Sequence, residues 1–191
     1  MKNLILIIAV AMTSVMSYGQ SMFDQFEDMD GVTSMVVNNK MFSMLANIEI
    51  NTDDPEAQQF VDMIKKITSL KVLTTGDEAI SGQMMSKVTS YLKSSNLDEL
   101  MRIKDGGQTV KIYVKEGKDE YHVKELLMFV NGLKEMTAGE DITINGKKRD
   151  IETVILSLTG DIDLRQISKL TDKMDMPGGK HLKKAGEKTK N

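Results

Sequence analysis

The stretch "ILSLTGDIDLRQISKL", residues 155–170, contains both of the periodicities that decide the fold. Apolar residues alternate as far as Leu158, which predicts a strand, and they recur at helical spacing from Leu164, which predicts a helix. A Thr-Gly-Asp step separates the two patterns, and the same step stands at residues 75–77 between another alternating run and another helical one. Each step is therefore expected to turn a strand into a helix.

The acidic residues around each step argue against a phosphate site. A phosphate-binding loop uses several glycines, backbone N–H groups free of competing anions and usually a lysine at the helix start. Here carboxylates stand at both helix starts and would repel a phosphate: Asp77 and Glu78 in the first copy, Asp161 and Asp163 in the second. Glycine gives the backbone freedom for a sharp turn, and carboxylates favour the positive end of a helix. The steps are interpreted as structural.

Both helix starts also have the spacing of a capping box. Thr75 is followed three residues later by Glu78, and Asp163 by Gln166. In this arrangement the first side chain accepts a backbone N–H group of the first helical turn, and the second side chain reaches back to the cap. Asp163 is therefore predicted to cap the last helix.

Two metal-binding interpretations stay open as alternatives. Asp161 and Asp163 offer carboxylate oxygens to a hard cation such as calcium, although the Asp-rich loop that would supply the other oxygens is missing. The chain has 16 methionines, and their sulfur atoms suit copper. Most of them lie on apolar stripes, where methionine fills gaps in a core. We predict no metal site; the closest methionine groupings are Met41 with Met44, Met84 with Met85, and Met174 with Met176.

Helical patterns dominate the first half of the chain and strand patterns the second half. "DGG" at 105–107 and "NG" at 145–146 stand next to alternating runs, which is a hairpin signal. The run Leu126 to Val130 is apolar on both faces, as in a central strand. We predict an α+β fold, a mainly antiparallel sheet of about five strands with helices packed on one face. Strand patterns cover 32–38, 70–74, 109–115, 122–130 and 152–159, and helical patterns cover 40–46, 55–67, 80–92 and 164–174.

The sequence carries no catalytic motif. It lacks a G-x-S-x-G elbow, an H-E-x-x-H motif and a glycine-rich dinucleotide fingerprint. Its two histidines are His181 and His122, and His122 is expected to point to solvent from a strand. Because the chain has no cysteine, thiol nucleophiles, Cys-ligated zinc and iron–sulfur clusters are excluded. We predict no catalytic residue and no cofactor, and keep a hydrolase that uses carboxylates alone as the alternative.

Residues 1–19 are predicted to be a secretory signal peptide. Lys2 is followed by an apolar run over 4–12 and by small residues that end at Gly19. The apolar run is far shorter than the ~20 residues of a spanning helix. A lipid anchor would need a cysteine at the cleavage point, and the chain has none. We expect a periplasmic or secreted protein, without transmembrane segment or lipid anchor, whose mature chain begins at Gln20.

Charge divides the mature chain into two parts. Residues 177–191 carry five lysines and one glutamate and are predicted to form a disordered basic tail. Residues 20–176 carry 19 basic and 27 acidic residues and are long enough for a single domain with its own core. The acidic character of this domain argues against nucleic acid as a partner.

Three stretches, "VKIYVKEG", "LLMFVNG" and "VILSLTGDIDLRQISKL", carry a family resemblance. The chain resembles the small exported Bacteroidota proteins grouped as domain of unknown function 4252. The resemblance covers about Phe23 to Met174, and its most specific part is Leu158 to Leu164. Members of that family look like signal-bearing proteins, some of them anchored through a lipidated cysteine that is absent here. The resemblance implies export, but no activity and no site residues.

The predicted function is that of an exported, non-enzymatic binding or interaction module of the cell envelope. Its partner is expected to be another envelope protein or an apolar ligand, bound by a face of the sheet or by the methionine-bearing helices. An exposed apolar face rimmed by charge would favour this function, whereas clustered acids lining a deep pocket would favour the periplasmic hydrolase.

Overall fold

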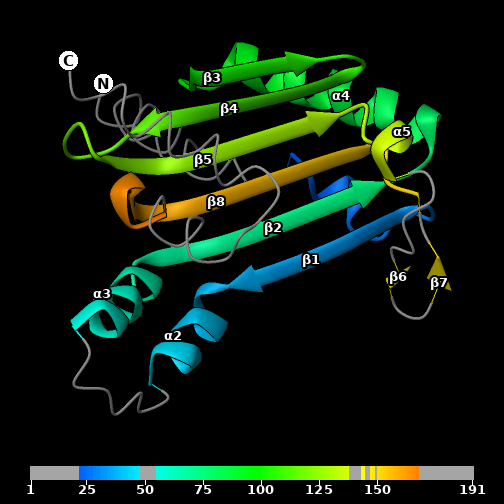
Figure 1. Ribbon diagram of the computed structural model, residues 1–191. Helices are drawn as coiled ribbons and strands as arrows, with labels where there is room; N and C mark the ends of the chain where they lie inside the picture. Colours follow the sequence, from blue (N-terminus) through cyan, green and yellow to red (C-terminus); the bar gives the residue numbers. More distant parts are fainter. Residues whose placement is uncertain (1–21, 48–54, 138–142, 145–146, 149, 168–191) are drawn as a thin grey trace, which may run out of the picture.

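Alternating apolar residues build one six-stranded antiparallel sheet, whose strand order is β1-β2-β8-β5-β4-β3 (Figure 1). The computed structural model describes residues 22–47, 55–137, 143–144, 147–148 and 150–167. The sheet consists of β1 (Val32–Asn38), β2 (Ile67–Thr75), β3 (Asp98–Asp105), β4 (Gln108–Glu116), β5 (His122–Asn131) and β8 (Thr153–Asp163). The other elements are η1 (Asp24–Phe26), α2 (Asn39–Asn47), α3 (Pro55–Ile64), α4 (Glu78–Ser94), α5 (Lys134–Thr137) and the two-stranded ribbon of β6 (Thr143–Ile144) and β7 (Lys147–Lys148).

The last strand of the sheet lies at its centre. β3, β4 and β5 follow one another as hairpins, and β8 then pairs with β5 on one side and with β2 on the other. The predicted turn at 105–107 is confirmed, because Asp105 pairs with Gln108 and Gly106 has a φ of +54°. The predicted hairpin around 145–146 is confirmed by the pairing of β6 with β7, although residues 145 and 146 themselves lie outside the described ranges.

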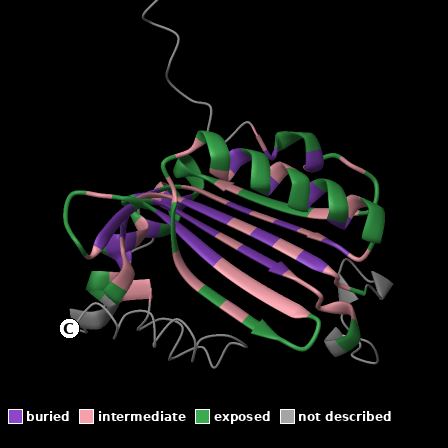
Figure 2. Cartoon of the chain, turned by 90° about the horizontal axis from the view of Figure 1, so that it is seen from above, coloured by how far each residue is buried: buried purple, intermediate pink, exposed green. Residues whose placement is uncertain are grey.

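The core lies between α4 and one face of the sheet, which we call the α4 face. Met84, Val88 and Tyr91 of α4 pack on side chains from β2, β4, β5 and β8, and Phe23 and Phe26 around η1 close the side of this core. α4 lies lengthwise over the strands, with its exposed residues turned away from them (Figure 2). The predicted helix over 80–92 is therefore confirmed, together with its apolar stripe.

The predicted packing of helices on one face holds for α4, and two further helices lie elsewhere. Phe42 of α2 and Ile64 of α3 belong to a second cluster, with Ile112, Leu126 and Leu158 of the sheet. α2 and α3 lie at one end of the sheet, on the side opposite α4 (Figure 1). The sheet also has six strands where about five were predicted. One of the six is β3, which forms the first arm of the hairpin predicted at 105–107.

The first Thr-Gly-Asp step turns a strand into a helix as predicted, but with a different cap. β2 ends at Thr75 and α4 begins at Glu78. Asp77 is the N-cap, and its Oδ1 accepts hydrogen bonds from two backbone N–H groups of the first turn. The hydroxyl of Thr75 donates instead to the carbonyl of Gly31 and accepts the N–H group of Asp77.

The second step does not turn the chain, so this part of the prediction is wrong. β8 runs through the step to Asp163, and helical residues begin at Leu164. Gly160 has a φ of +144° and lies where the registers of β8 with β2 and with β5 both shift. The strand continues because both neighbours hold it, as in the hydrogen bond from the Asp161 N–H group to the Lys66 carbonyl. Gly160 thus allows a bulge, not a turn.

Several predictions concern residues outside the described ranges. These are the signal peptide at 1–19, the tail at 177–191 with His181, the grouping of Met174 with Met176, and residues 168–174 of the last helix. Within the described ranges, every helix falls short of the length and apolar character that a membrane span requires.

Candidate functional site

The face of the sheet opposite α4, called here the opposite face, is apolar across all six strands. Cross-strand partners lie on the same face, so the pairing register gives its composition. The central row, one residue from each strand in the order of the sheet, is Met35, Val72, Leu156, Met128, Ile112 and Met101. The row on one side is Val37, Leu70, Leu158, Leu126 and Val114, and the row on the other side is Thr33, Thr74, Val154, Val130, Val110 and Ile103.

The two faces of the sheet differ in how far they are buried. On the α4 face, Leu73, Leu127 and Ile155 are fully covered. On the opposite face, four residues of the central row (Val72, Leu156, Met128 and Met101) are only partly buried and Met35 is 49% exposed, whereas Ile112 is buried. Apolar side chains thus extend from one edge strand to the other, and in the central row those of every strand except β4 are partly exposed. A continuous apolar surface of this kind is typical of an interaction site.

The described helices leave the middle of the opposite face without a covering element. α4 lies behind the sheet in Figure 1, and α2 and α3 reach only the end of the opposite face where β2 begins. Three of the six residues in the central row are methionines. Methionine is unbranched and polarisable, so a surface rich in it adapts to partners of different shape.

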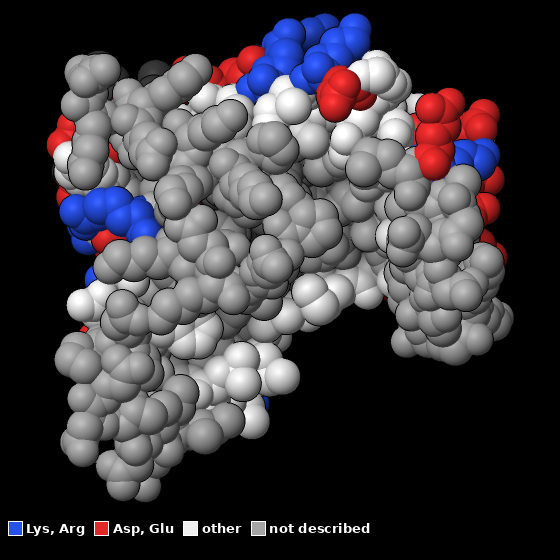
Figure 3. All heavy atoms as spheres, in the orientation of Figure 1, with Lys and Arg blue, Asp and Glu red and all other residues white. Residues whose placement is uncertain are grey.

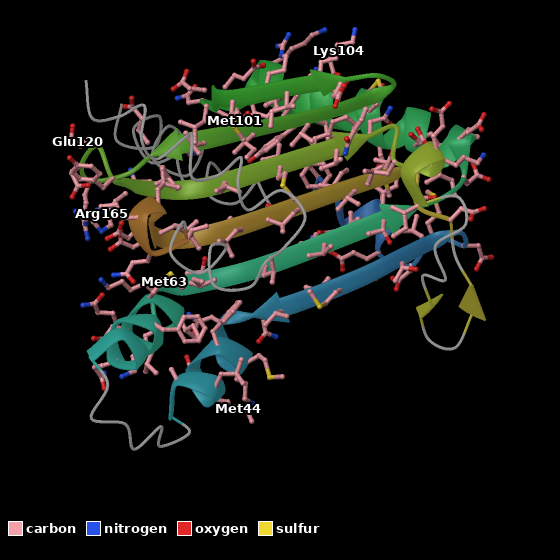
Figure 4. The ribbon with its side chains drawn as sticks, in the orientation of Figure 1. Met44, Met63, Met101, Lys104, Glu120 and Arg165 are labelled. Carbon is pink, nitrogen blue, oxygen red and sulfur yellow. The ribbon has the colours of Figure 1, made fainter. Side chains whose placement is uncertain are left out.

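Charged residues border this face along the β3 edge and at one end of the sheet. Lys104 points outward from β3 at one edge, and Glu120 and Arg165 lie at the end of the sheet, whereas Met101 lies inside this border (Figure 4). Ion pairs occupy the same end, between Lys118 and Asp161 at 2.8 Å and within the cluster around Asp163. The arrangement is an apolar face with a charged border, which is the arrangement that favours a binding module over an enzyme.

The structure brings three of the residues considered for chemistry, His122, Asp161 and Asp163, to one end of the sheet. His122 Nδ1 lies 2.7 Å from Asp119 Oδ1, and its Nε2 lies 3.9 Å from Asp163 Oδ2. His122 is 9% exposed, so the prediction that it points to solvent is wrong. The imidazole lies between these two carboxylates: Asp119 belongs to the turn before β5, and Asp163 belongs to β8, which is distant in the sequence.

The two aspartates considered as calcium ligands have separate partners. Asp163 pairs with Arg165, whose guanidinium also lies 4.4 Å from the centre of the Tyr121 ring, and Asp161 pairs with Lys118. These hydrogen bonds from cations hold the pKa of each aspartate below its ordinary value. In the part of the chain that the structure describes, no group of three or more His, Cys, Asp or Glu side chains could hold a metal ion.

Asp163 is a cap, as predicted, but it does not form the predicted capping box. Its Oδ1 accepts a hydrogen bond from the backbone N–H group of Arg165, with 3.0 Å between the nitrogen and the oxygen. The amide of Gln166, predicted to reach back to the cap, donates instead to Gln59 of α3 at 3.5 Å.

Replacing Asp163 by alanine should lower the free energy of unfolding by about 1 kcal/mol at pH 7, because the helix loses its cap. Asp161→Ala is the matched control and should cost less than about 0.5 kcal/mol, because only a surface ion pair is lost. The loss for Asp163→Ala should fade in acid, since a lowered carboxyl pKa stabilises the fold only at pH values where the carboxyl is ionised. Urea denaturation at pH 7 and at low pH measures both effects. Equal losses for the two variants, or a calcium-dependent melting temperature in the wild type, would contradict the capping role.

One buried ionisable pair lies on the α4 face. The hydroxyl of Tyr91 donates to both carboxylate oxygens of Glu125, at 2.7 and 2.8 Å. Burial raises the pKa of Glu125, and burial and the carboxylate also raise the pKa of Tyr91. Glu125 is 7% exposed and lies under α4. The pair therefore belongs to the core and not to a pocket lined by clustered acids, which the hydrolase alternative would use.

The methionine groupings considered for copper separate into buried and exposed residues. Met84 is fully buried against the sheet, as expected for a residue that fills the core. Met85 is 43% exposed on the outer side of α4. Met41 and Met44 are both exposed on α2, and Met44 points away from the sheet (Figure 4).

Fold and surface together define the class of protein: a small α+β domain whose six-stranded sheet has an apolar face with a charged border. The family described as domain of unknown function (DUF4252) matches residues 26–170, and the chain belongs to this family. The resemblance found from the sequence is thus confirmed over most of the chain. Neither a curated protein nor a solved structure gives a significant match.

Proposed function

We propose that this protein is an exported interaction module of the cell envelope, without catalytic activity, which binds a partner on the opposite face of the sheet. The observation that carries the proposal is the central row of Met35, Val72, Leu156, Met128, Ile112 and Met101. Export is supported by the order of charged, apolar and small residues over 1–19.

The shape of this face favours a protein partner. A six-stranded sheet presents a broad surface. α4 shows that a helix can cover such a surface, because it buries one stripe of its side chains against the strands. An amphipathic helix of another envelope protein would bury its own stripe on the opposite face in the same way. The methionines would adapt to its side chains, and the charged border would contact its polar flanks.

Binding of N-phenyl-1-naphthylamine, an uncharged apolar dye, tests whether the opposite face is accessible. The mature protein should increase the fluorescence of the dye, and Met128→Gln should weaken dye binding several-fold, because it places an amide in the middle of the apolar surface. Met85→Gln is the matched control, since Met85 is exposed on the outer side of α4. Equal binding by the two variants, or no binding by the wild type, would show that the opposite face is not available.

A further inference from the structure

The two edges of the sheet are built differently. β3, at one edge, has five charged residues among its eight and a register shift between Glu99 and Met101. Charges and bulges are the features that protect an edge strand from pairing with another chain. β1, at the other edge, reads VTSMVVN, without charge, proline or bulge. The structure therefore protects one edge and leaves the backbone of the other able to pair.

The surface around β1 is also apolar. Met35 and Val36 of β1 are each 49% exposed, and Met44 of the following helix is 59% exposed. Together with Met41 and Leu45 of α2, they are five of the six large hydrophobic residues found exposed among the described residues. Figure 3 shows Lys, Arg, Asp and Glu gathered along the β3 edge. Near β1 and α2, most of the described atoms that are visible belong to uncharged residues.

We propose that β1 is a dimerisation strand, which pairs antiparallel with β1 of a second copy of this chain. This interface goes beyond the proposed function, because it uses the edge of the sheet and needs no other protein. An antiparallel pair of identical strands has a two-fold axis, so the same seven residues serve both sides of the contact. A neutral strand can pair with itself without placing like charges opposite each other.

Opposite charges near the strand ends fit a pair of β1 strands that is centred on Met35. If Met35 faces Met35 of the second copy at the axis, Asp30, in the turn before one β1, lies near the first turn of α2 in the other copy, where Lys40 can form an ion pair with it. This ion pair occurs twice by symmetry, and both residues are exposed. A shift by two residues, the smallest that keeps each side chain on its face, brings Lys40 towards Asp28 in one direction and towards Val32 in the other, so charge favours the Met35 register only over the second shift.

The dimer would join two sheets into one. Because the two-fold axis is perpendicular to the sheet, the opposite face of one copy continues into that of the other. The central rows then meet at Met35 and form one apolar row across twelve strands. A long partner would find a continuous binding surface there.

Sedimentation velocity of the mature protein tests the association itself. We expect a concentration-dependent dimer whose dissociation constant rises roughly tenfold or more in Met35→Lys, because two lysines would then face each other at the axis. Met85→Lys, the same change on α4, should leave the dimer unchanged. Asp30→Lys and Lys40→Glu should each weaken the dimer, and the combined variant should restore it. A wild type that stays monomeric at all concentrations, or equal effects of the two lysine variants, would overturn the proposal.

The absence of cysteine from the chain allows the register to be tested by disulfide trapping. Directly opposed residues of antiparallel strands lie ~4.5–5.5 Å apart between Cα atoms, which a disulfide can span. Met35→Cys alone should form a covalent dimer on oxidation. Thr33→Cys and Val37→Cys should each stay monomeric alone and should cross-link when the two proteins are mixed. A covalent dimer of Thr33→Cys alone, or none in the mixture, would contradict this register, and both results are independent of binding to the opposite face.

Discussion

Replacing Gly160 by alanine is expected to lower the free energy of unfolding by about 2–5 kcal/mol, although only one methyl group is added. The φ of Gly160 is +144°, a conformation that residues with a side chain rarely adopt. A Cβ atom there would lie 2.3 Å from the carbonyl oxygen of Lys66 and 2.8 Å from Cα of Ile67. Both contacts are with backbone atoms of β2 or of the residue before it, so β2 and β8 would have to separate to relieve them.

The control for Gly160→Ala is the same substitution in α4. Gly82 lies within the helix, and a Cβ atom there has no neighbour within 4 Å. Gly82→Ala should therefore raise the free energy of unfolding by about 0.5–1 kcal/mol, because alanine favours a helix more than glycine does. Urea denaturation of both variants measures the difference. A loss below 1 kcal/mol for Gly160→Ala would contradict the close approach of β8 to β2 at Gly160.

Tyr91→Phe should lower the free energy of unfolding by about 2–3 kcal/mol at pH 7, because the ionised Glu125 would lose both hydrogen bonds from the hydroxyl. The loss should shrink in acid. Burial raises the folded-state pKa of Glu125, so protonation of this residue stabilises the fold below its ordinary pKa, and the stabilisation is lost as the pH rises through the folded value. The missing hydroxyl would raise this pKa further, because its hydrogen bond favours the ionised form.

A double-mutant cycle separates the hydrogen bond from the loss of the hydroxyl itself. In Glu125→Gln the amide oxygen still accepts from Tyr91, but no charge is buried. Tyr91→Phe should then cost only about 0.5–1.5 kcal/mol, the value for a neutral hydrogen bond. Urea denaturation at pH 7 and pH 4 gives all four values. The same cost in both backgrounds and at both pH values would show that Glu125 is not ionised in the folded protein.

Features that depend on neighbouring residues were predictable from the sequence. β1, α4 and the hairpins at 105–107 and 145–146 follow from local alternation, helical spacing and turn residues, and the structure contains each of them. The alternation within each strand also shows which of its residues share a face of the sheet. The sequence does not show which residues of different strands stand opposite one another, so the rows of the opposite face became visible only in the pairing register.

Predictions failed where residues distant in the sequence decide the outcome. Gly160 resembles a turn glycine, but Lys66 and the neighbouring strands keep it in the sheet. His122 stands among charged residues in the sequence, yet Asp119 and Asp163 enclose it. The exposure of the β1 edge likewise depends on strand order. In each case a long-range contact overrides a correct local pattern.

Site-specific photo-cross-linking in the cells that make the protein tests most directly whether the opposite face binds a partner. A photoreactive phenylalanine derivative would replace Met128 in the central row or, as control, Met85 on the outer side of α4. We expect a covalent adduct with one envelope protein from position 128 and none from position 85. Leu156→Gln should reduce the adduct at position 128, since Leu156 pairs directly with Met128. No adduct at position 128, or the same adducts from both positions, would contradict the proposal that this face is the binding surface.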